Sequence, residues 1–208
     1  LGAQYVSSLE HFRSGWELAV TLDDPRLMRQ ATTFSTFFHF WQGRFRETVA
    51  LYEQSLPDIE SYPRGGFPLL GQMTAGYCYA VTGQVSQGLG MLDAVRNQCL
   101  ELGDLYVAAF TGGNIGTILL EIGRIEDAIT YLKLSSKEAR QVHNDWVWIT
   151  CLMLLAYAHF LNGDTGSCLT CLQEFLKSSQ KTRTTVKMYP YLLELGLAVA
   201  RGELPPVA

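Results

Sequence analysis

The sequence predicts an all-α fold, a solenoid built of antiparallel helix hairpins. The first observation behind this prediction is a set of glycines that recur every 40 residues, at Gly43, Gly83, Gly123 and Gly163. The second is that apolar side chains between these glycines follow helical spacing, and not the alternation of strands. The third is that side chains of similar size recur at fixed distances from each glycine. A repeat of this length is typical of proteins in which each unit buries its apolar face against the next.

The recurring side chains stand where the two helices of a hairpin must approach each other. A small residue on each helix permits close contact, and a large apolar residue fills the space beside it. Each glycine supplies backbone freedom at the end of a helix. The small residues seven before each glycine are Thr36, Gly76, Gly116 and Ala156, those five after it are Thr48, Gly88, Ala128 and Cys168, and the large residues nine after it are Tyr52, Leu92, Leu132 and Leu172.

Taken in chain order, this register predicts ten helices with short polar connections. The first is the second helix of a repeat whose first helix would lie upstream, and the next begins at Pro25 after an Asp24 cap. The helices that follow alternate as first and second helices of four repeats, and Pro205 and Pro206 stop the last one. The predicted helices span about 4–22, 25–42, 45–61, 67–82, 85–102, 105–122, 125–143, 146–162, 165–180 and 187–201.

We expect one helical-repeat domain over residues 1–208, made of complete repeats between two half repeats. The half repeats are 1–24 and 185–208, and the complete repeats are 25–64, 65–104, 105–144 and 145–184. Because both terminal segments are half repeats and the chain opens on Leu1, we expect a fragment of a larger protein. Repeat stacks need polar caps, and these terminal helices are apolar, so we expect either flanking domains of the full protein or a second copy, in a homodimer, to cover them.

The composition argues against several classes of protein. Hydrophobic residues make up 48% of the chain, enough for a large core, and the net charge of −4 comes from scattered charges with no basic patch for nucleic acid. The five cysteines follow no disulfide framework, which indicates a reducing, cytoplasmic compartment. The apolar run 146–161 is shorter than the about 20 residues that span a bilayer, so we expect a buried helix and no membrane partner.

The residues that could carry chemistry lack the patterns that chemistry needs. The segment 111–116 is rich in glycine but has neither phosphate-loop spacing nor a preceding strand. Cys168 and Cys171 form a C-x-x-C pair without two further zinc ligands, and Cys168 occupies a small slot of the hairpin. His39 and His159 both stand four residues before a turn, which favours packing over metal binding or catalysis. We therefore expect no catalytic residue, no metal and no cofactor, and predict that the protein is not an enzyme.

The clearest copy of the repeat, GNIGTILLEIGRIEDAITYLKLSSKEARQVHND over 113–145, resembles the tetratricopeptide repeat (TPR) superfamily. The second helix of the preceding repeat ends at Leu102, Gly103 and Asp104, as in the roughly 40-residue TPR variety. That variety occurs in bacterial signalling and transcription-activator proteins and in eukaryotic adaptors. The chain departs from the family pattern in lacking the proline that ends many shorter TPR units and in having Thr36 and Ala156 where glycine is usual. The resemblance implies a right-handed superhelix.

The resemblance also implies that the first helix of each repeat lines a concave groove that binds partners. The groove residues stand at set distances before each turn, and they are apolar or aromatic, which suits a peptide or helix and disfavours a carboxylate clamp. The alternative is that these side chains pack against neighbouring helices. The polar Asn114 has no counterpart in the other repeats, which have Phe34, Thr74 and Leu154 at this position. The candidate partner-binding residues are Thr33, Phe37, Trp41, Met73, Tyr77, Asn114, Thr117, Glu121, Met153 and Tyr157.

The function indicated by these features is a protein–protein interaction scaffold in a signalling or transcription-regulatory protein, with a protein or peptide in the groove. Two alternatives stay open. One is a sensor domain that binds a small apolar ligand or a peptide, and the other is an oligomerisation scaffold that uses the terminal helices.

Overall fold

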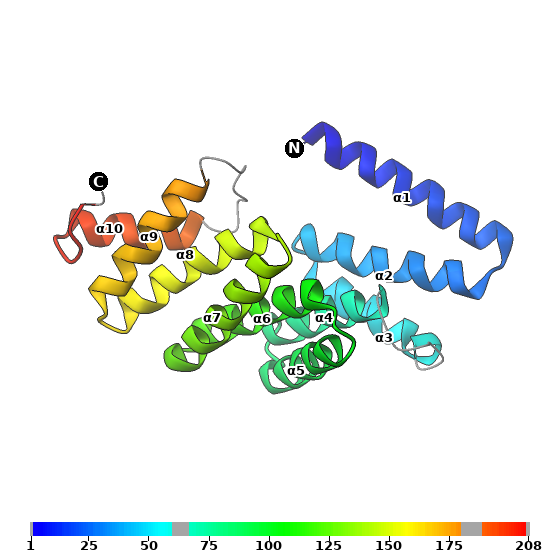
Figure 1. The fold of residues 1–208 in the computed structure, drawn as a ribbon. Coiled ribbons are helices and arrows are strands. Elements are labelled where there is room, and N and C mark those ends of the chain that lie inside the picture. The colour runs from blue at the N-terminus through cyan, green and yellow to red at the C-terminus, as the bar shows by residue number, and fades with distance from the viewer. Residues whose placement is uncertain (1, 60–66, 180–188, 207–208) are drawn as a thin grey trace. The chain divides into compact units, whose positions relative to one another are not determined.

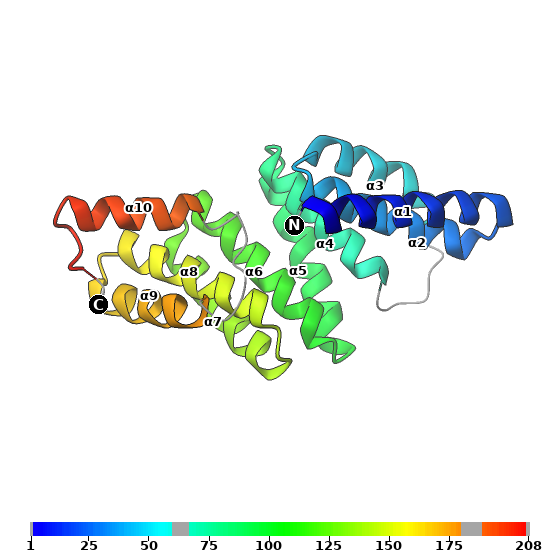
Figure 2. The ribbon, with the colours of Figure 1, turned by 90° about the horizontal axis from the view of Figure 1, so that it is seen from above.

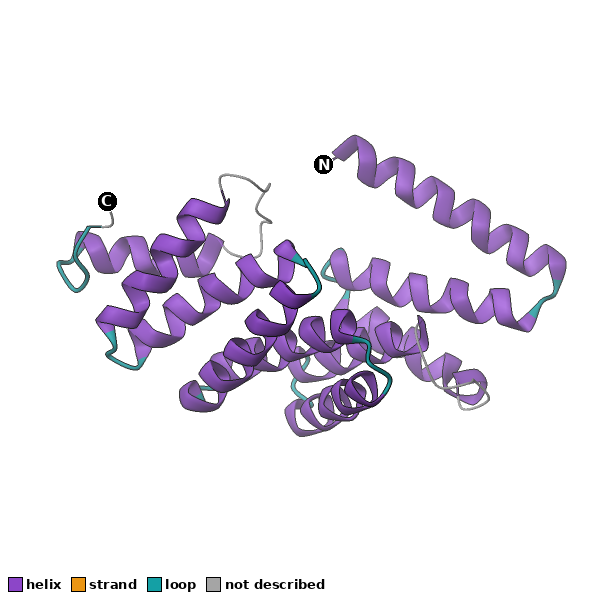
Figure 3. Ribbon diagram, viewed as in Figure 1, coloured by secondary structure: helices purple, strands orange, loops and turns teal. Residues whose placement is uncertain are grey.

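The computed structural model describes residues 2–59, 67–179 and 189–206, and these residues form helices joined by short turns (Figure 3). The chain divides into two compact units, Leu1–Met91 and Leu92–Ala208, and each is described by itself. The predicted all-α hairpin fold is confirmed. None of the described helices is both long and apolar enough to cross a membrane.

The first unit contains four helices and the start of a fifth (Figure 1). Helix α2 packs against α3 and α4, and α1 runs beside α2. Phe40, Tyr52 and Cys78 are almost completely buried in the core that α2, α3 and α4 share. The helices are α1 (Gly2–Leu22), α2 (Pro25–Trp41), α3 (Phe45–Ile59), α4 (Phe67–Val81) and α5 (Val85–Glu101), whose second half belongs to the other unit.

The second unit continues the same alternation of helices. Helix α8 packs against α7, α9 and α10, and α9 and α10 flank it (Figure 2). Met153, Cys168 and Leu195 belong to the core that α8, α9 and α10 share. The helices are α6 (Leu105–Glu121), α7 (Ile125–Gln141), α8 (Asp145–Leu161), α9 (Thr165–Ser179) and α10 (Tyr189–Ala200). These bounds agree with the predicted helices within two residues where the chain is described, and the predicted ends at 61, 180 and 187 lie outside the described residues.

The four glycines of the 40-residue register end the first helices, as predicted. Gly43, Gly83, Gly123 and Gly163 have φ between +74° and +105°, a region that glycine enters without steric cost. The residue after each glycine donates its N–H to a carbonyl five residues back, as Arg124 does to Leu119 at 2.8 Å, which satisfies a carbonyl that the helix leaves free. The same turn recurs between repeats at Gly103, with φ +75°.

The predicted close approach within each hairpin is confirmed in the second and third repeats. A Cβ atom placed on Gly88 would lie 2.5 Å from the carbonyl oxygen of Gly76, and a Cβ atom on Gly116 would lie 2.6 Å from Cγ of Leu132. Neither position has room for a side chain. The glycine-rich segment 111–116 therefore belongs to a packed helix, α6, as the register predicts.

A buried ion pair ties α5, α6 and α7 together, and the repeat register gave no indication of it. Arg96 is 6% exposed, and its Nη2 donates to Oε1 of Glu138 at 2.7 Å. Its Nη1 donates to the other carboxylate oxygen at 3.0 Å and to the carbonyl oxygen of Ala108 at 3.1 Å. Gly112 on α6 lies beside the guanidinium, since a Cβ atom there would be 3.6 Å from Cζ of Arg96, an ordinary van der Waals contact.

Candidate partner-binding surface

Two columns of side chains on the first helices remain accessible, six and two residues before each turn glycine. All eight are half-buried or exposed, and Trp41 is 36% exposed. We call the four of each unit the first-helix face of that unit. They are Phe37, Trp41, Tyr77 and Val81 in the first unit, and Thr117, Glu121, Tyr157 and Leu161 in the second unit.

Four predicted partner-binding residues contribute little or nothing to this face. Met73 and Met153 are completely buried, Thr33 is 9% exposed and Asn114 is 8% exposed, which corrects the expectation that they line a groove. Thr33, Met73 and Met153 stand ten residues before a turn. That position packs against the next first helix, since a Cβ atom on Gly71 of α4 would lie 3.3 Å from Cγ2 of Thr33.

In the first unit, the aromatic side chains of the face also form a packed cluster around Phe40. The ring centroid of Phe40 lies 5.5 Å from that of Trp41 and 5.3 Å from that of Tyr77, both in edge-to-face geometry. Phe37 contacts Trp41 in the same geometry at 5.8 Å. Such pairs contribute about 0.5–1.5 kcal/mol beyond the burial of their area. Phe37, Trp41 and Tyr77, the three predicted residues in this cluster, therefore each pack one side of the ring against the core and leave the other side accessible.

In the second unit, the face is more polar and receives a side chain from α10. The hydroxyl of Tyr191 donates to Oε1 of Glu121 at 2.6 Å, and its ring centroid lies 5.3 Å from that of Tyr157. Thr117 donates its hydroxyl to the carbonyl oxygen of Gly113 at 2.8 Å, within its own helix. Burial, with help from the carboxylates of Glu194 and Glu121, raises the pKa of Tyr157 above its ordinary value. This tyrosine therefore stays a neutral hydroxyl group at neutral pH.

Asn114 is a buried amide whose donor has no hydrogen-bond acceptor among the described residues. The side chain is 8% exposed, and Nδ2 is fully enclosed. Asn114, Thr117 and Glu121 follow the spacing i, i+3, i+7, which places them along one side of α6. An amide donor buried without a partner costs about 1–3 kcal/mol, and because this donor is enclosed, a peptide on the surface of α6 does not reach it.

Solved structures of helical-repeat proteins are similar to this chain. BtubC (BKLC) from P. vanneervenii superposes with a TM-score of 0.71 at 13% identity, over 97% of this chain and 84% of that one. A putative kinesin light chain from Podosopora anserina with nearly identical TPR-like repeats superposes with a TM-score of 0.65 at 17% identity, over 86% and 89%. The fold is TPR-like.

A third TPR-like structure, the Rap conjugation gene regulator of the plasmid pLS20, was solved in complex with the Phr* peptide. It superposes with a TM-score of 0.59 at 17% identity, over 85% of this chain and 54% of that one. At these identities the likeness concerns the fold. No protein-family model matches the sequence, and no curated protein matches it.

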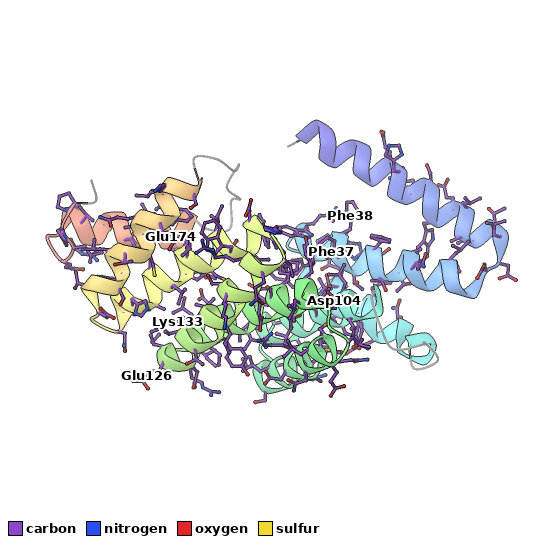
Figure 4. All side chains as sticks on the ribbon, viewed as in Figure 1. Phe37, Phe38, Asp104, Glu126, Lys133 and Glu174 are labelled. Atoms are coloured by element: carbon purple, nitrogen blue, oxygen red, sulfur yellow. The ribbon has the colours of Figure 1, made fainter. Side chains whose placement is uncertain are left out.

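The first unit of this TPR-like chain also contains an apolar cleft between α1 and α2, which sequence reasoning missed. Its volume is about 550 Å³, and Phe38 projects into it from the side of α2 that faces α1 (Figure 4). A Cβ atom on Gly15 would meet nothing within 4 Å, whereas Val95, Ser135 and Phe175 at the same register position are buried. The absence of a side chain at Gly15, where three other repeats have a buried one, was the sequence signal for this cleft. The cleft is lined by His11, Gly15, Trp16, Leu18, Ala19, Leu27, Gln30, Ala31, Phe34 and Phe38.

Cys168 and His159, two of the side chains that suggested chemistry, are buried in the second unit. Cys168 is completely buried, and burial raises the pKa of its thiol to about 11, which leaves it unreactive at neutral pH. His159 is 5% exposed, and burial lowers its pKa below the ordinary 6.5 although Asp164 Oδ2 lies 3.4 Å from Nδ1. It is therefore neutral at pH 7. In the described part of the chain, no three His, Cys, Asp or Glu side chains stand close enough together to hold a metal ion.

Proposed function

We propose that this chain is a non-enzymatic protein-interaction scaffold whose first-helix face binds a peptide or a helix of a partner protein. The observation that carries the proposal is that Thr117, Glu121, Tyr157 and Leu161 stay accessible on α6 and α8, two first helices of the second unit that pack against each other. A TPR-like fold, and a TPR-like neighbour solved in complex with a peptide, support it.

The two kinds of side chain on the face suit two parts of a peptide. In the second unit, the hydroxyl oxygen of Thr117 can accept from a main-chain N–H of an extended segment, which gives affinity that depends little on sequence. Tyr157 of the same unit offers a ring for an apolar side chain, and Tyr is frequent among the residues that dominate binding energy. The partner is therefore a segment with apolar or aromatic side chains.

We place the chain in a larger signalling or transcription-regulatory protein of the cytoplasm. The 40-residue repeat variety supports the first part of this proposal. Support for the second comes from the cysteines, since Cys78, Cys99, Cys151, Cys168 and Cys171 are all free thiols.

The test is selection from a displayed library of random peptides, followed by affinity measurement of the enriched peptides by calorimetry. Tyr157→Ala removes an accessible ring of the face and should weaken binding about tenfold, which corresponds to about 1.4 kcal/mol. Leu134→Ala on α7, where the side chain is 46% exposed on a second helix, is the control and should leave the affinity unchanged. Enrichment of no peptide, or equal affinity of the Tyr157 variant, would contradict the proposal.

The cleft between α1 and α2 favours a second candidate function, the sensing of a small apolar ligand. Its volume of about 550 Å³ lies within the about 300–1,000 Å³ of ligand pockets, and most of its lining is apolar. The probe is anilinonaphthalene sulfonate, whose fluorescence rises in apolar pockets. Gly15→Leu puts a side chain into the cleft and should abolish the signal, while an unchanged signal would exclude the cleft as the binding site.

A further inference from the structure

The side chain of Tyr191 reaches from α10 to α6. Its hydroxyl donates to the Glu121 carboxylate at 2.6 Å across 70 positions of sequence, and its ring lies against Tyr157 of α8. The acceptor is an exposed carboxylate of the first-helix face, and the ring partner also belongs to that face. A side chain of the chain itself is thus bound where we propose that partners bind.

The repeat register shows that Tyr191 is unusual at its position. The residues at the same place in the preceding first helices are Gly71, Thr111 and Cys151, all small and buried. These residues lie where neighbouring first helices contact each other. Cys151 of α8, for example, faces α6, since a Cβ atom on Gly113 would lie 3.6 Å from its Sγ atom. A tyrosine is too large for that slot, so it extends over the face of α8 and reaches Glu121.

We propose that Glu121 and Tyr157 form a binding site for a tyrosine side chain, which Tyr191 fills in the free chain and a partner's tyrosine fills in the complex. This inference rests on the proposed function and names the partner chemistry of the same face. A phenol fits both components, since its hydroxyl donates to a carboxylate, a short and strong type of hydrogen bond, and its ring packs edge or face against Tyr157. Phenylalanine would supply only the ring.

The charges around the site also predict whether it binds unmodified tyrosine or phosphotyrosine. The carboxylates of Glu121 and Glu194 both act on the Tyr157 hydroxyl. A phosphotyrosine would add nearly two negative charges beside Glu121 and would lose the hydroxyl donor, so phosphorylation of the partner should disfavour binding. The site therefore selects unmodified tyrosine.

Displacement of Tyr191 does not require α10 to leave the unit. Leu195 and Ala198, which are 1% and 0% exposed, hold α10 in the core that it shares with α8 and α9. Tyr191 itself is only half-buried. A rotation of its side chain to another rotamer frees Glu121 and the ring of Tyr157 while the helix stays in place.

The experiment uses two displayed random-peptide libraries that differ only in a fixed central residue, tyrosine or phenylalanine. The best tyrosine peptide is resynthesised with phenylalanine and with phosphotyrosine, and all three affinities are measured. We expect the tyrosine form to bind about tenfold more tightly than the phenylalanine form, because it alone gives Glu121 a donor, and the phosphotyrosine form to bind at least as weakly as phenylalanine.

Two variants and one control test whether the preference for tyrosine over phenylalanine comes from Glu121 and Tyr157. Glu121→Gln should reduce the preference for tyrosine over phenylalanine to about twofold or less, while Glu126→Gln, an exposed glutamate of α7 (Figure 4), should leave it unchanged. Tyr191→Phe keeps the ring and removes the competing hydroxyl, so it should tighten binding of the tyrosine peptide about threefold to fivefold. Circular dichroism checks that the helices of each variant are intact.

The outcomes separate this inference from the proposed function. Failure of both libraries to yield any binding peptide would overturn the proposed function and the inference together. Peptides that bind the first-helix face with equal affinity for tyrosine and phenylalanine, and without response to Tyr191→Phe, would overturn the tyrosine site alone.

Discussion

Replacing Gly88 by alanine should destabilise the protein, although alanine is the better helix former. Gly88 lies on α5 and faces α4, and the added Cβ atom would lie 2.5 Å from the carbonyl oxygen of Gly76 and 2.6 Å from the amide nitrogen of Ala80. Both are backbone atoms, so relief requires the two helices to separate. Overpacking of this kind costs about 1–3 kcal/mol, against a gain of about 0.5–1 kcal/mol from helix propensity. The net expectation is a loss of up to about 2.5 kcal/mol.

Gly90 on the same helix is the matched control, because a Cβ atom there would meet nothing within 4 Å. Gly90→Ala should stabilise the protein by about 0.5–1 kcal/mol. At about 2–4 °C per kcal/mol for a chain of this size, the thermal midpoints of the two variants should differ by several degrees. The measurement is thermal and urea unfolding followed by circular dichroism. A Gly88→Ala variant as stable as Gly90→Ala would refute the close-packing reasoning.

Other predictions follow from buried charges. Glu138→Ala leaves the Arg96 guanidinium buried without its carboxylate and should cost about 3–5 kcal/mol in urea unfolding, whereas Asp127→Ala breaks an exposed pair and should cost less than about 1 kcal/mol. Burial lowers the pKa of His159 in the folded chain, so the unfolded chain binds the proton first as pH falls below about 7 and the free energy of unfolding decreases. His159→Gln should flatten that decrease between pH 7 and the lowered pKa in a series of urea titrations, and an unchanged slope would contradict the assignment.

The helices and turns could be predicted because the information that specifies them is local and repeated. A glycine with positive φ, small residues on both sides of a hairpin and an Asp or Asn at a helix start each act within a few residues of sequence. Asp104 caps α6 by accepting from the N–H of Val107 at 3.1 Å, and Asn144 caps α8 in the same way. Because these signals recur every 40 residues, the bounds of each helix can be predicted from its own segment of sequence.

The accessible surface could be predicted only in part, because exposure depends on what the next helix covers. Phe37, Trp41, Tyr77, Thr117, Glu121 and Tyr157 are accessible as the register implied. Met73 and Met153 are not, because the register gives the side of the helix that faces the next repeat but not how far that repeat covers it.

Contacts between distant residues were outside the reach of sequence reasoning. Tyr191 meets Glu121 across 70 positions, and Arg96 meets Glu138 across 42. Neither pair recurs from repeat to repeat, so the register that revealed the fold carried no signal for them. The departures of Tyr191 and Gly15 from the residue size of their register positions were the only local indications.

Photo-cross-linking of a selected peptide tests the central claim, that the first helices carry the binding surface, most directly. The peptide carries a photoreactive phenylalanine analogue, and mass spectrometry identifies the protein residues to which it becomes attached. We predict attachment to α6 and α8, at residues such as Thr117, Tyr157 and Leu161 of the first-helix face. Attachment confined to second helices, such as the exposed Leu134 of α7, would contradict it.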